Sequence, residues 1–206
     1  MTAEPMPEYT PEPAQNPDAL PDWLIPPPDG WRAEDLDRIP QLPAHTELID
    51  GDLVFVIPQR DFHTVTMDML VNGLRRTAPD HLRVRREMSV TLDERQRPEP
   101  DIVVLHAEAI KGPAVTSYAG AYVVLAVEVV SPSSELLDRK RKPQLYAEAG
   151  VPHYWLVDML DNDPRVSVFE LDPASDQYVQ TGVHHNRLKV SVPYDIDIDL
   201  TEGNRL

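Results

Sequence analysis

The chain of 206 residues contains no cysteine. This absence excludes disulfide bridges, thiolate zinc sites and cysteine nucleophiles. The chain also lacks any hydrophobic run near the ~18 residues that a membrane span requires. Its first ten residues, MTAEPMPEYT, include neither a basic stretch nor an apolar core, so they do not have the pattern of a secretory signal. These absences predict a cytoplasmic protein with no membrane segment. The length suits one domain with a sizeable core and an additional tail.

Basic residues are also scarce, with 19 Lys and Arg against 35 Asp and Glu and a formal net charge of −16. This balance argues against a protein that coats nucleic acid, because phosphate binding requires positive surface. The negative charge is partly peripheral. Residues 1–43 contain nine acids against only Arg32 and Arg38.

Proline is concentrated in the same segment, since residues 1–43 hold eleven of the 22 prolines. Proline removes an amide donor and restricts φ, so this density disfavours regular structure. We predict an extension, 1–43, that partly wraps a domain formed by 44–206, with a short helical turn near 31–36. The first twenty or so residues have too few apolar groups to offset the entropy of ordering, and we expect them to be disordered.

The remaining sequence alternates between strand and helix patterns. A hairpin is predicted at 46–57 because Asp50-Gly51 favours a type I′ turn between alternating segments. Helical spacing of apolar residues predicts a helix at 61–78 with Asp61 as its N-cap. A second helix should follow the hydroxyl residues 131–134 and end near Gly150. Strands are expected at 82–92, 97–105, 123–130 and 151–158, a loop at 107–120, and an antiparallel meander at 165–171, 177–182 and 187–192. This order predicts a mixed α/β core.

Two acids in these strands provide the main functional clue. Glu128 interrupts the β-branched run 123–130, and a buried carboxylate is costly unless another group pairs with it. Asp101 leads into the strand at 97–105. Acids in two neighbouring strands indicate a site for Mg²⁺ or Mn²⁺, which prefer oxygen ligands.

Such a metal makes water nucleophilic and neutralises phosphate charge, so the acids suggest phosphodiester hydrolysis. Lys142, from the following helix, would orient the water or stabilise the developing charge. Asp138, Lys142 and Tyr146 are spaced by four residues, which places them on one helix face.

Four segments together resemble the Uma-type putative restriction endonuclease family of the PD-(D/E)XK nuclease superfamily: RPEPDIVVL, EVVSPSS, DRKRK and YAEAGVPHYWLVD. The hairpin TELIDGDLV, His63 and Glu87 also fall where that family has its pattern. The resemblance covers roughly 45–192. It implies a restriction-endonuclease-like fold, with a mixed β-sheet core flanked by helices, an N-terminal hairpin and C-terminal antiparallel strands.

The resemblance also implies an activity and a set of site residues. The activity is metal-dependent hydrolysis of phosphodiester bonds in DNA, with Mg²⁺ or Mn²⁺ as cofactor, and cleavage of both strands would favour a homodimer. The implied metal ligands are Asp101 and Glu128. The implied catalytic residues are Asp101, Glu128, Lys142, Glu47 and His63.

The chain departs from the superfamily pattern at the lysine. The usual position, two residues after the acid, is Val130, and the resemblance implies that Lys142 replaces it. Pro143 follows directly, and an interior proline costs a helix ~3 kcal/mol or more. Either the helix restarts at Pro143 or it bends there.

Each residue also has an ordinary structural alternative. Asp101 can cap a strand entry, and Glu128 can pair structurally with Arg85 or Lys142. Lys142 can be a solvated helix residue, Glu47 an exposed hairpin acid, and His63 a capping histidine. The basic group Arg75, Arg76, Arg83, Arg85 and Arg86 is either a solvated face or a surface that tracks phosphates.

For the whole chain, the alternative to a DNA endonuclease is a weakly active or inactive nuclease-fold module that binds or regulates. The acidic balance and Pro143 favour the module. The retention of Asp101, Glu128 and Lys142 favours the enzyme. A phosphodiesterase directed at RNA is a third reading.

Overall fold

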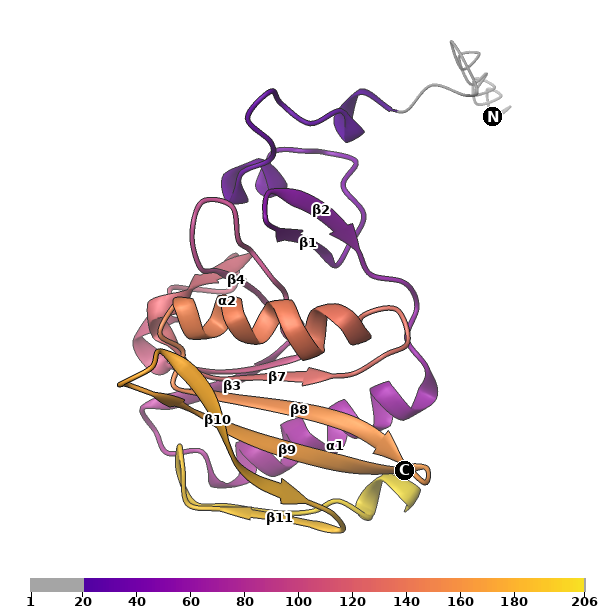
Figure 1. Ribbon diagram of the computed structural model, residues 1–206, viewed down its shortest axis with the longest axis vertical. Coiled ribbons are helices and arrows are strands. Elements are labelled where there is room, and N and C mark those ends of the chain that lie inside the picture. Colours follow the sequence, from indigo (N-terminus) through magenta and orange to yellow (C-terminus); the bar gives the residue numbers. More distant parts are fainter. Residues whose placement is uncertain (1–20, 206) are drawn as a thin grey trace, which may run out of the picture.

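The computed structural model describes residues 21–205, and a six-stranded sheet forms its centre (Figure 1). Its strand order is β10-β9-β8-β7-β5-β3. The strands are β3 (Leu82–Arg86), β5 (Ile102–His106), β7 (Val123–Val129), β8 (His153–Leu160), β9 (Asp163–Asp172) and β10 (Gln177–His184). Only β7 and β8 pair in parallel, and the other neighbours are antiparallel. The mixed sheet predicted from the sequence is therefore confirmed.

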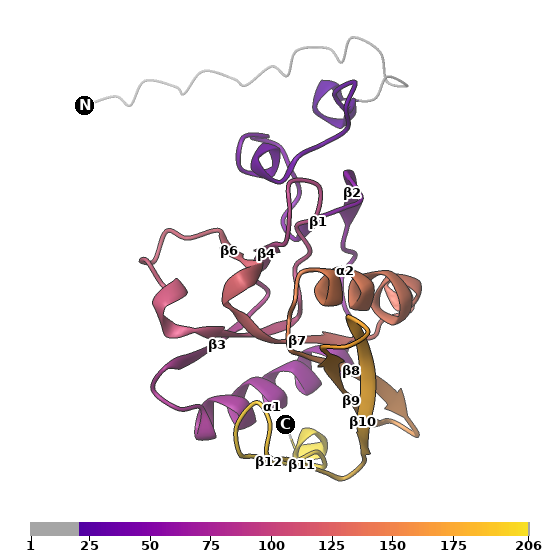
Figure 2. The ribbon, with the colours of Figure 1, turned by 60° about the vertical axis from the view of Figure 1, so that its left-hand side comes forward.

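Two helices cover opposite faces of this sheet (Figure 2). Helix α1 (Asp61–Thr77) lies on one face and α2 (Lys142–Glu148) on the other. Residues of β7 contribute to the cores on both faces of the sheet, because successive side chains of a strand point to opposite faces. Val127 and Val129 join the apolar core beneath α1, whereas Ala126 belongs to the core beneath α2. Glu128 therefore points toward α2.

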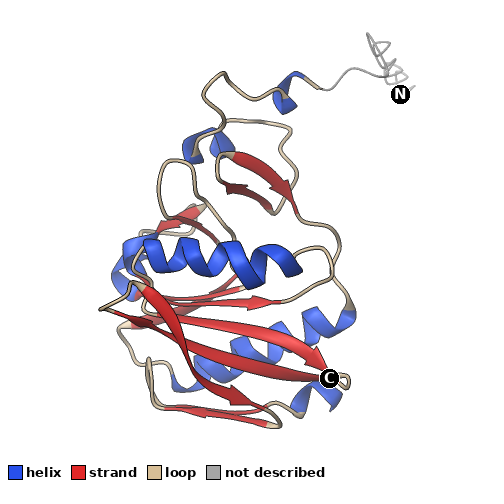
Figure 3. Cartoon of the chain, in the orientation of Figure 1, coloured by secondary structure: helices blue, strands red, loops and turns tan. Residues whose placement is uncertain are grey.

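The N-terminal hairpin lies on the α2 side, beyond the helix (Figure 3). It consists of β1 (Thr46–Ile49) and β2 (Asp52–Phe55), as predicted. Asp50 and Gly51 both have positive φ, 57° and 84°, which is the backbone that a type I′ turn requires. All four residues of β1 are buried.

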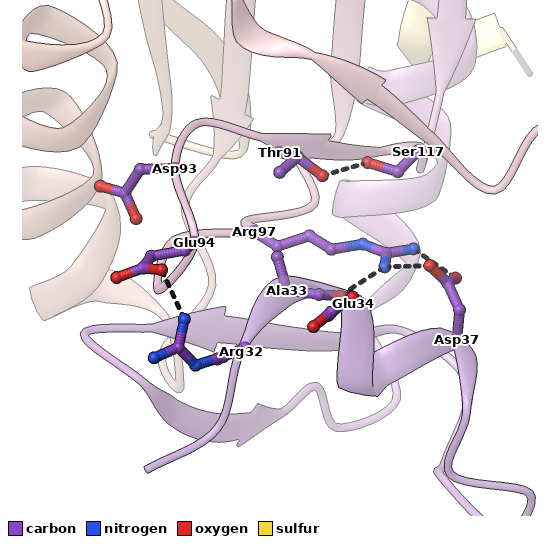
Figure 4. A pocket seen from close by; sticks show the side chains of 9 residues that line it. All are labelled: Arg32, Ala33, Glu34, Asp37, Thr91, Asp93, Glu94, Arg97 and Ser117. Carbon is purple, nitrogen blue, oxygen red and sulfur yellow. Dashed lines mark hydrogen bonds and ion pairs between the residues drawn. The ribbon is translucent and has the colours of Figure 1, made fainter. Parts of the chain in front are cut away.

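The described part of the extension is held on the domain by Arg97 (Figure 4). It contains two 3₁₀ helices, η1 (Asp22–Leu24) and η2 (Ala33–Asp37), the second near the predicted turn. The Arg97 guanidinium donates to both Asp37 carboxylate oxygens, at 2.8 and 2.9 Å, and to the Ala33 carbonyl. The predicted disorder of the first twenty residues concerns a segment outside the described residues.

Several predicted elements were wrong in detail. The strand predicted at 82–92 is interrupted at Glu87, which has a φ of 49°. Beyond the interruption, β4 (Ser89–Thr91) pairs in parallel with β6 (Ser117–Ala119), within the segment predicted as a loop. Regular pairing along 97–105 begins only at Ile102. Asp61 is the first residue of α1, and Arg60 occupies the N-cap position without a side-chain capping bond.

The predicted C-terminal meander is only partly present. β9 and β10 pair antiparallel, but β11 (Arg187–Val190) pairs with β12 (Ile196–Asp199) in a separate two-stranded sheet. The apolar residues of this small sheet pack with α1, so α1 lies between two sheets. Within residues 21–205, no helix is long and apolar enough to cross a membrane.

Candidate active site

A buried lysine surrounded by carboxylates lies between α2 and the sheet. The Lys142 ammonium is 2.9 Å from Glu47 Oε1, 3.1 Å from Glu128 Oε2 and 3.4 Å from Asp138 Oδ1. All four residues are buried. They come from β1, β7 and α2 with its preceding turn, so residues distant in sequence assemble one charged group.

Pro143 shapes the turn that carries Lys142. Residues Leu137–Arg141 form a π-helical turn, and the Lys142 amide donates to the Leu137 carbonyl. Proline has no N–H, and its ring would clash with the carbonyl four residues earlier in a regular α-helix. The wider turn avoids this conflict, and α2 restarts with the proline in its first turn. Single π turns of this kind are frequent at functional sites. The proline is therefore compatible with a lysine directed at Glu128.

Two tyrosines donate hydrogen bonds to residues of this group. The Tyr146 hydroxyl donates to Glu128 Oε1 at 2.7 Å, while Lys142 holds the other oxygen. The Tyr154 hydroxyl donates to the Asp138 backbone carbonyl at 2.6 Å. Both Glu128 oxygens therefore have fixed partners, which orients the carboxylate.

Asp101 lies beside this group at the end of β5. β5 pairs antiparallel with β7 with Ile102 opposite Val127, and continuing this register by one residue places Asp101 opposite Glu128. Opposed residues in antiparallel strands share a face. Asp101 Oδ2 accepts a hydrogen bond from the Val129 amide at 2.6 Å, and His63 Nε2 is 3.0 Å from Oδ1. Asp101 thus joins the end of β7 to the first turn of α1.

The buried group contains three carboxyl side chains and one lysine, and burial shifts the pKa values of several of its members. Burial raises the pKa of Glu128 well above its usual range. The charge of Lys142 opposes this shift, and the nearby carboxylates of Asp138, Asp101 and Glu47 add to it. Burial also raises the pKa of Asp138 to about 6, although Lys142 opposes the shift. Burial by itself would lower the pKa of Lys142, but the surrounding carboxylates outweigh it and raise this pKa well above the usual value.

His63 is the other titratable group beside Asp101. Burial lowers the pKa of His63, but the hydrogen bond and the charge of Asp101 outweigh that effect and raise it overall. The Nδ1 atom of His63 is buried without a hydrogen-bond partner.

The donor set matches a hard divalent cation in its chemistry. Asp101 and Glu128 offer carboxylate oxygens, and Mg²⁺ is commonly bound through one or two carboxylates with its remaining ligands supplied by water and substrate. Burial raises the pKa values of Glu128 and Asp138 even with Lys142 beside them, and a bound cation would stabilise their charged forms. Within residues 21–205, no three His, Asp or Glu side chains converge on one point as a metal-binding group. The fit is therefore one of donor chemistry, in two carboxylates, and not of a three-ligand group.

The structure decides among several of the sequence-based alternatives. Glu47 is buried against Lys142 and is not an exposed hairpin acid. Lys142 is not solvated, and it is the cation that pairs with Glu128. Arg85 instead donates to the Val84 carbonyl. Asp101 accepts a hydrogen bond from the Val129 amide at the end of β7, not within the strand that it leads into, and it also contacts His63.

The arginines of the basic group bind either main-chain carbonyls or carboxylates. Arg75, Arg76 and Arg83 donate to backbone carbonyls, as Arg85 does. Arg86 pairs with Asp68 and Glu87. These contacts favour a structural part for much of this group.

Three residues that the implied site does not include belong to this network. Asp138 contacts Lys142, and Tyr146 contacts Glu128. Each lies four residues from Lys142, and this helical spacing was the signal in the sequence that could have identified them. The Glu99 amide donates to Glu47 Oε1 at 2.7 Å, and its carboxylate lies 2.5 Å from His45 Nδ1. The part of Glu99 had no sequence signal, because it depends on how the hairpin packs.

The mixed sheet, its flanking helices and the buried group of carboxylates around a lysine define a mixed α/β protein with a buried charged site. The chain belongs to the Uma2 family, described as "Putative restriction endonuclease", whose model matches residues 33–201. It is similar in structure to a protein from Anabaena variabilis described as "a putative nuclease belonging to DUF820", with a TM-score of 0.59 and 21% identity over 77% of this chain and 88% of that one. No curated protein matches the sequence. Family and fold together support nuclease function in general.

Proposed function

We propose that this protein is a metal-dependent endonuclease that hydrolyses phosphodiester bonds in DNA. The observation that carries the proposal is the buried group in which Lys142 contacts Glu47 and Glu128. A protein selected only to fold gains little from such a group, because replacing buried ion pairs by apolar residues is often neutral or stabilising. Membership of the nuclease family supports the same conclusion.

In this proposal Asp101 and Glu128 would hold Mg²⁺ or Mn²⁺, which when bound would supply activation of a water and neutralisation of phosphate charge. His63 and the Val129 amide orient Asp101, while Tyr146 orients Glu128. The pKa of Lys142 is raised, so its side chain remains an ammonium at neutral pH. Lys142 therefore stabilises negative charge on the phosphate, in preference to removing a proton from water. Glu47 also contacts the ammonium and helps to hold it in place.

A second candidate is a nuclease-fold module that binds or regulates without turnover. The observation in its favour is that both Glu128 oxygens are engaged by protein groups, Lys142 and Tyr146, so metal entry requires at least one contact to rearrange. The net charge of −16 also opposes broad contact with nucleic acid.

Cleavage of supercoiled plasmid in Mn²⁺ separates the two candidates. The wild type should nick and linearise DNA. Lys142→Ala and Glu128→Gln should each lose at least about 10²-fold in rate, as removal of a key electrostatic group does. Lys140→Ala removes an exposed lysine from the same turn and should cut at the wild-type rate. Equal rates in all four proteins would show that the activity is a contaminant, and metal binding without cleavage would favour the module.

Three further features complete the proposal. Residues 44–206 form the nuclease domain and residues 1–43 its extension, the enzyme acts in the cytoplasm, and a homodimer cleaves both strands. Light scattering on purified protein, alone and with a DNA duplex, tests the dimer. A monomer under both conditions would contradict it.

A further inference from the structure

A cavity of about 260 Å³ lies next to His63. His63 contacts Asp101, so this cavity is one side chain away from the proposed metal ligands. Its volume falls just below the ~300–1,000 Å³ usual for small-molecule pockets. A space of this size accommodates about one nucleotide unit, not a duplex.

One wall of the cavity is apolar and partly open. Phe62, Pro132 and Met159 line it, and Met159 is 49% exposed. An aromatic ring and a polarisable thioether provide a surface on which a nucleobase can stack.

The charges of the cavity leave one cation available. Glu135 and Asp158 also line it, but Arg139 pairs with both and Arg165 pairs with Asp158. Arg60 is exposed, and in the part of the chain that the structure describes no carboxylate pairs with its guanidinium. Arginine is suited to bind phosphate because its planar group donates two parallel hydrogen bonds.

His63 also lines the cavity. The His63 side chain is only 6% exposed, and its Nδ1 is buried without a partner, although Nε2 is engaged by Asp101. Buried polar atoms normally have partners, so Nδ1 keeps an unused hydrogen-bonding capacity in a residue that lines the cavity.

From these observations we infer that the cavity is a subsite for one nucleotide, whose base stacks on Phe62 and Met159 and whose phosphate binds Arg60. The inference deepens the proposed function and rests on it. The subsite would hold the nucleotide beside the cleaved bond and so influence where the enzyme cuts. The same chemistry is offered by a free nucleoside monophosphate and by a nucleotide within a strand.

Binding without cleavage tests the subsite directly. Titration calorimetry in EDTA with dAMP, adenosine, deoxyribose 5-phosphate and a short oligo(dA) strand compares the wild type with three variants. Arg60→Ala should weaken dAMP binding about tenfold, the effect of losing one charge-assisted hydrogen bond. Met159→Ala should weaken the binding of dAMP but not the binding of deoxyribose 5-phosphate, which has no base to stack. Lys111→Ala removes the same charge from an exposed loop beyond the other end of β5 and should leave binding within about twofold.

The outcomes separate the subsite from the nuclease. Absence of saturable dAMP binding, or equal weakening by Arg60→Ala and Lys111→Ala, overturns the subsite even if plasmid is cut. Arg60-dependent binding by a protein that never cuts leaves the subsite standing and removes the nuclease. Tighter binding of oligo(dA) than of dAMP identifies a strand as the occupant, and the reverse identifies a free nucleotide.

Discussion

Lys142 and Arg97 are both buried basic side chains, but their partners differ in number and exposure. Lys142 contacts three carboxylates, all of them buried. Arg97 pairs with one carboxylate, Asp37, whose side chain is 47% exposed. The pKa values respond in opposite directions. Burial raises the pKa of Asp138 beside Lys142, whereas the hydrogen bond from Arg97 lowers the pKa of Asp37.

This difference distinguishes a functional group from a structural one. The Arg97 pair is balanced, and one of its members remains in water, so it fastens the extension at little electrostatic cost. The Lys142 group places three buried carboxyl groups around one ammonium, and burial raises the pKa of Glu128 and Asp138. Such an arrangement is expected where a further cation is to be bound, because perturbed carboxylates gather at functional sites.

The largest expected effect is that of Lys142→Met on stability without added metal. The substitution leaves three buried carboxylates without their cation and should lower the free energy of unfolding by ~3–5 kcal/mol. Arg97→Met should cost less, since Asp37 can be hydrated. Urea unfolding in EDTA measures both variants. Equal losses would remove the distinction between the two cations.

Asp138→Asn should stabilise the protein at high pH. The pKa of Asp138 is raised to about 6 in the folded state, so the native protein loses stability as pH rises from the unfolded value toward 6. An asparagine does not ionise, so the variant avoids this loss. Its free energy of unfolding at pH 8 should exceed that of the wild type by up to ~3 kcal/mol. Urea unfolding at pH 8 and pH 5 should show a smaller gain at pH 5. A gain independent of pH would mean that the carboxylate charge is not responsible.

Tyr146→Phe should lower the free energy of unfolding by ~1–3 kcal/mol, because one buried Glu128 oxygen loses its donor. Plasmid cleavage should also slow, since Glu128 loses an orienting contact. Tyr178→Phe is the matched control, as its hydroxyl donates to the Val151 carbonyl away from the charged group. Similar cleavage rates in the two variants would show that Tyr146 has no part in orienting Glu128.

The smallest effect should come from Asp37→Asn. A partly exposed ion pair contributes ~0–1 kcal/mol. The pKa of Asp37 is lowered, so this stabilisation is present above the ordinary carboxyl range and disappears as pH falls. The pH dependence should thus be opposite to that of Asp138→Asn. Limited proteolysis near residues 33–43 should become faster at pH 7. Unchanged cleavage there would indicate that other contacts hold the extension.

Elements with strong local signals could be predicted from the sequence. The Asp50-Gly51 turn, the helical spacing of α1 and the continuous apolar run of β7 are each encoded within a few residues. The position of Glu128 within that run also predicted correctly that its carboxylate requires a partner. Such signals are reliable because turn geometry and side-chain periodicity depend on near neighbours.

Sequence motifs determined the family of this protein and singled out Asp101, Glu128 and Lys142 as a set. Only the tertiary structure decided their partners. The burial of Glu47 depends on how the hairpin packs over α2, and the contact of His63 with Asp101 depends on where α1 crosses the sheet. The pairing of β11 with β12 joins segments whose local pattern did not distinguish them from a meander. These features arise from contacts between distant segments, which fix the surroundings of a charge and therefore its pKa.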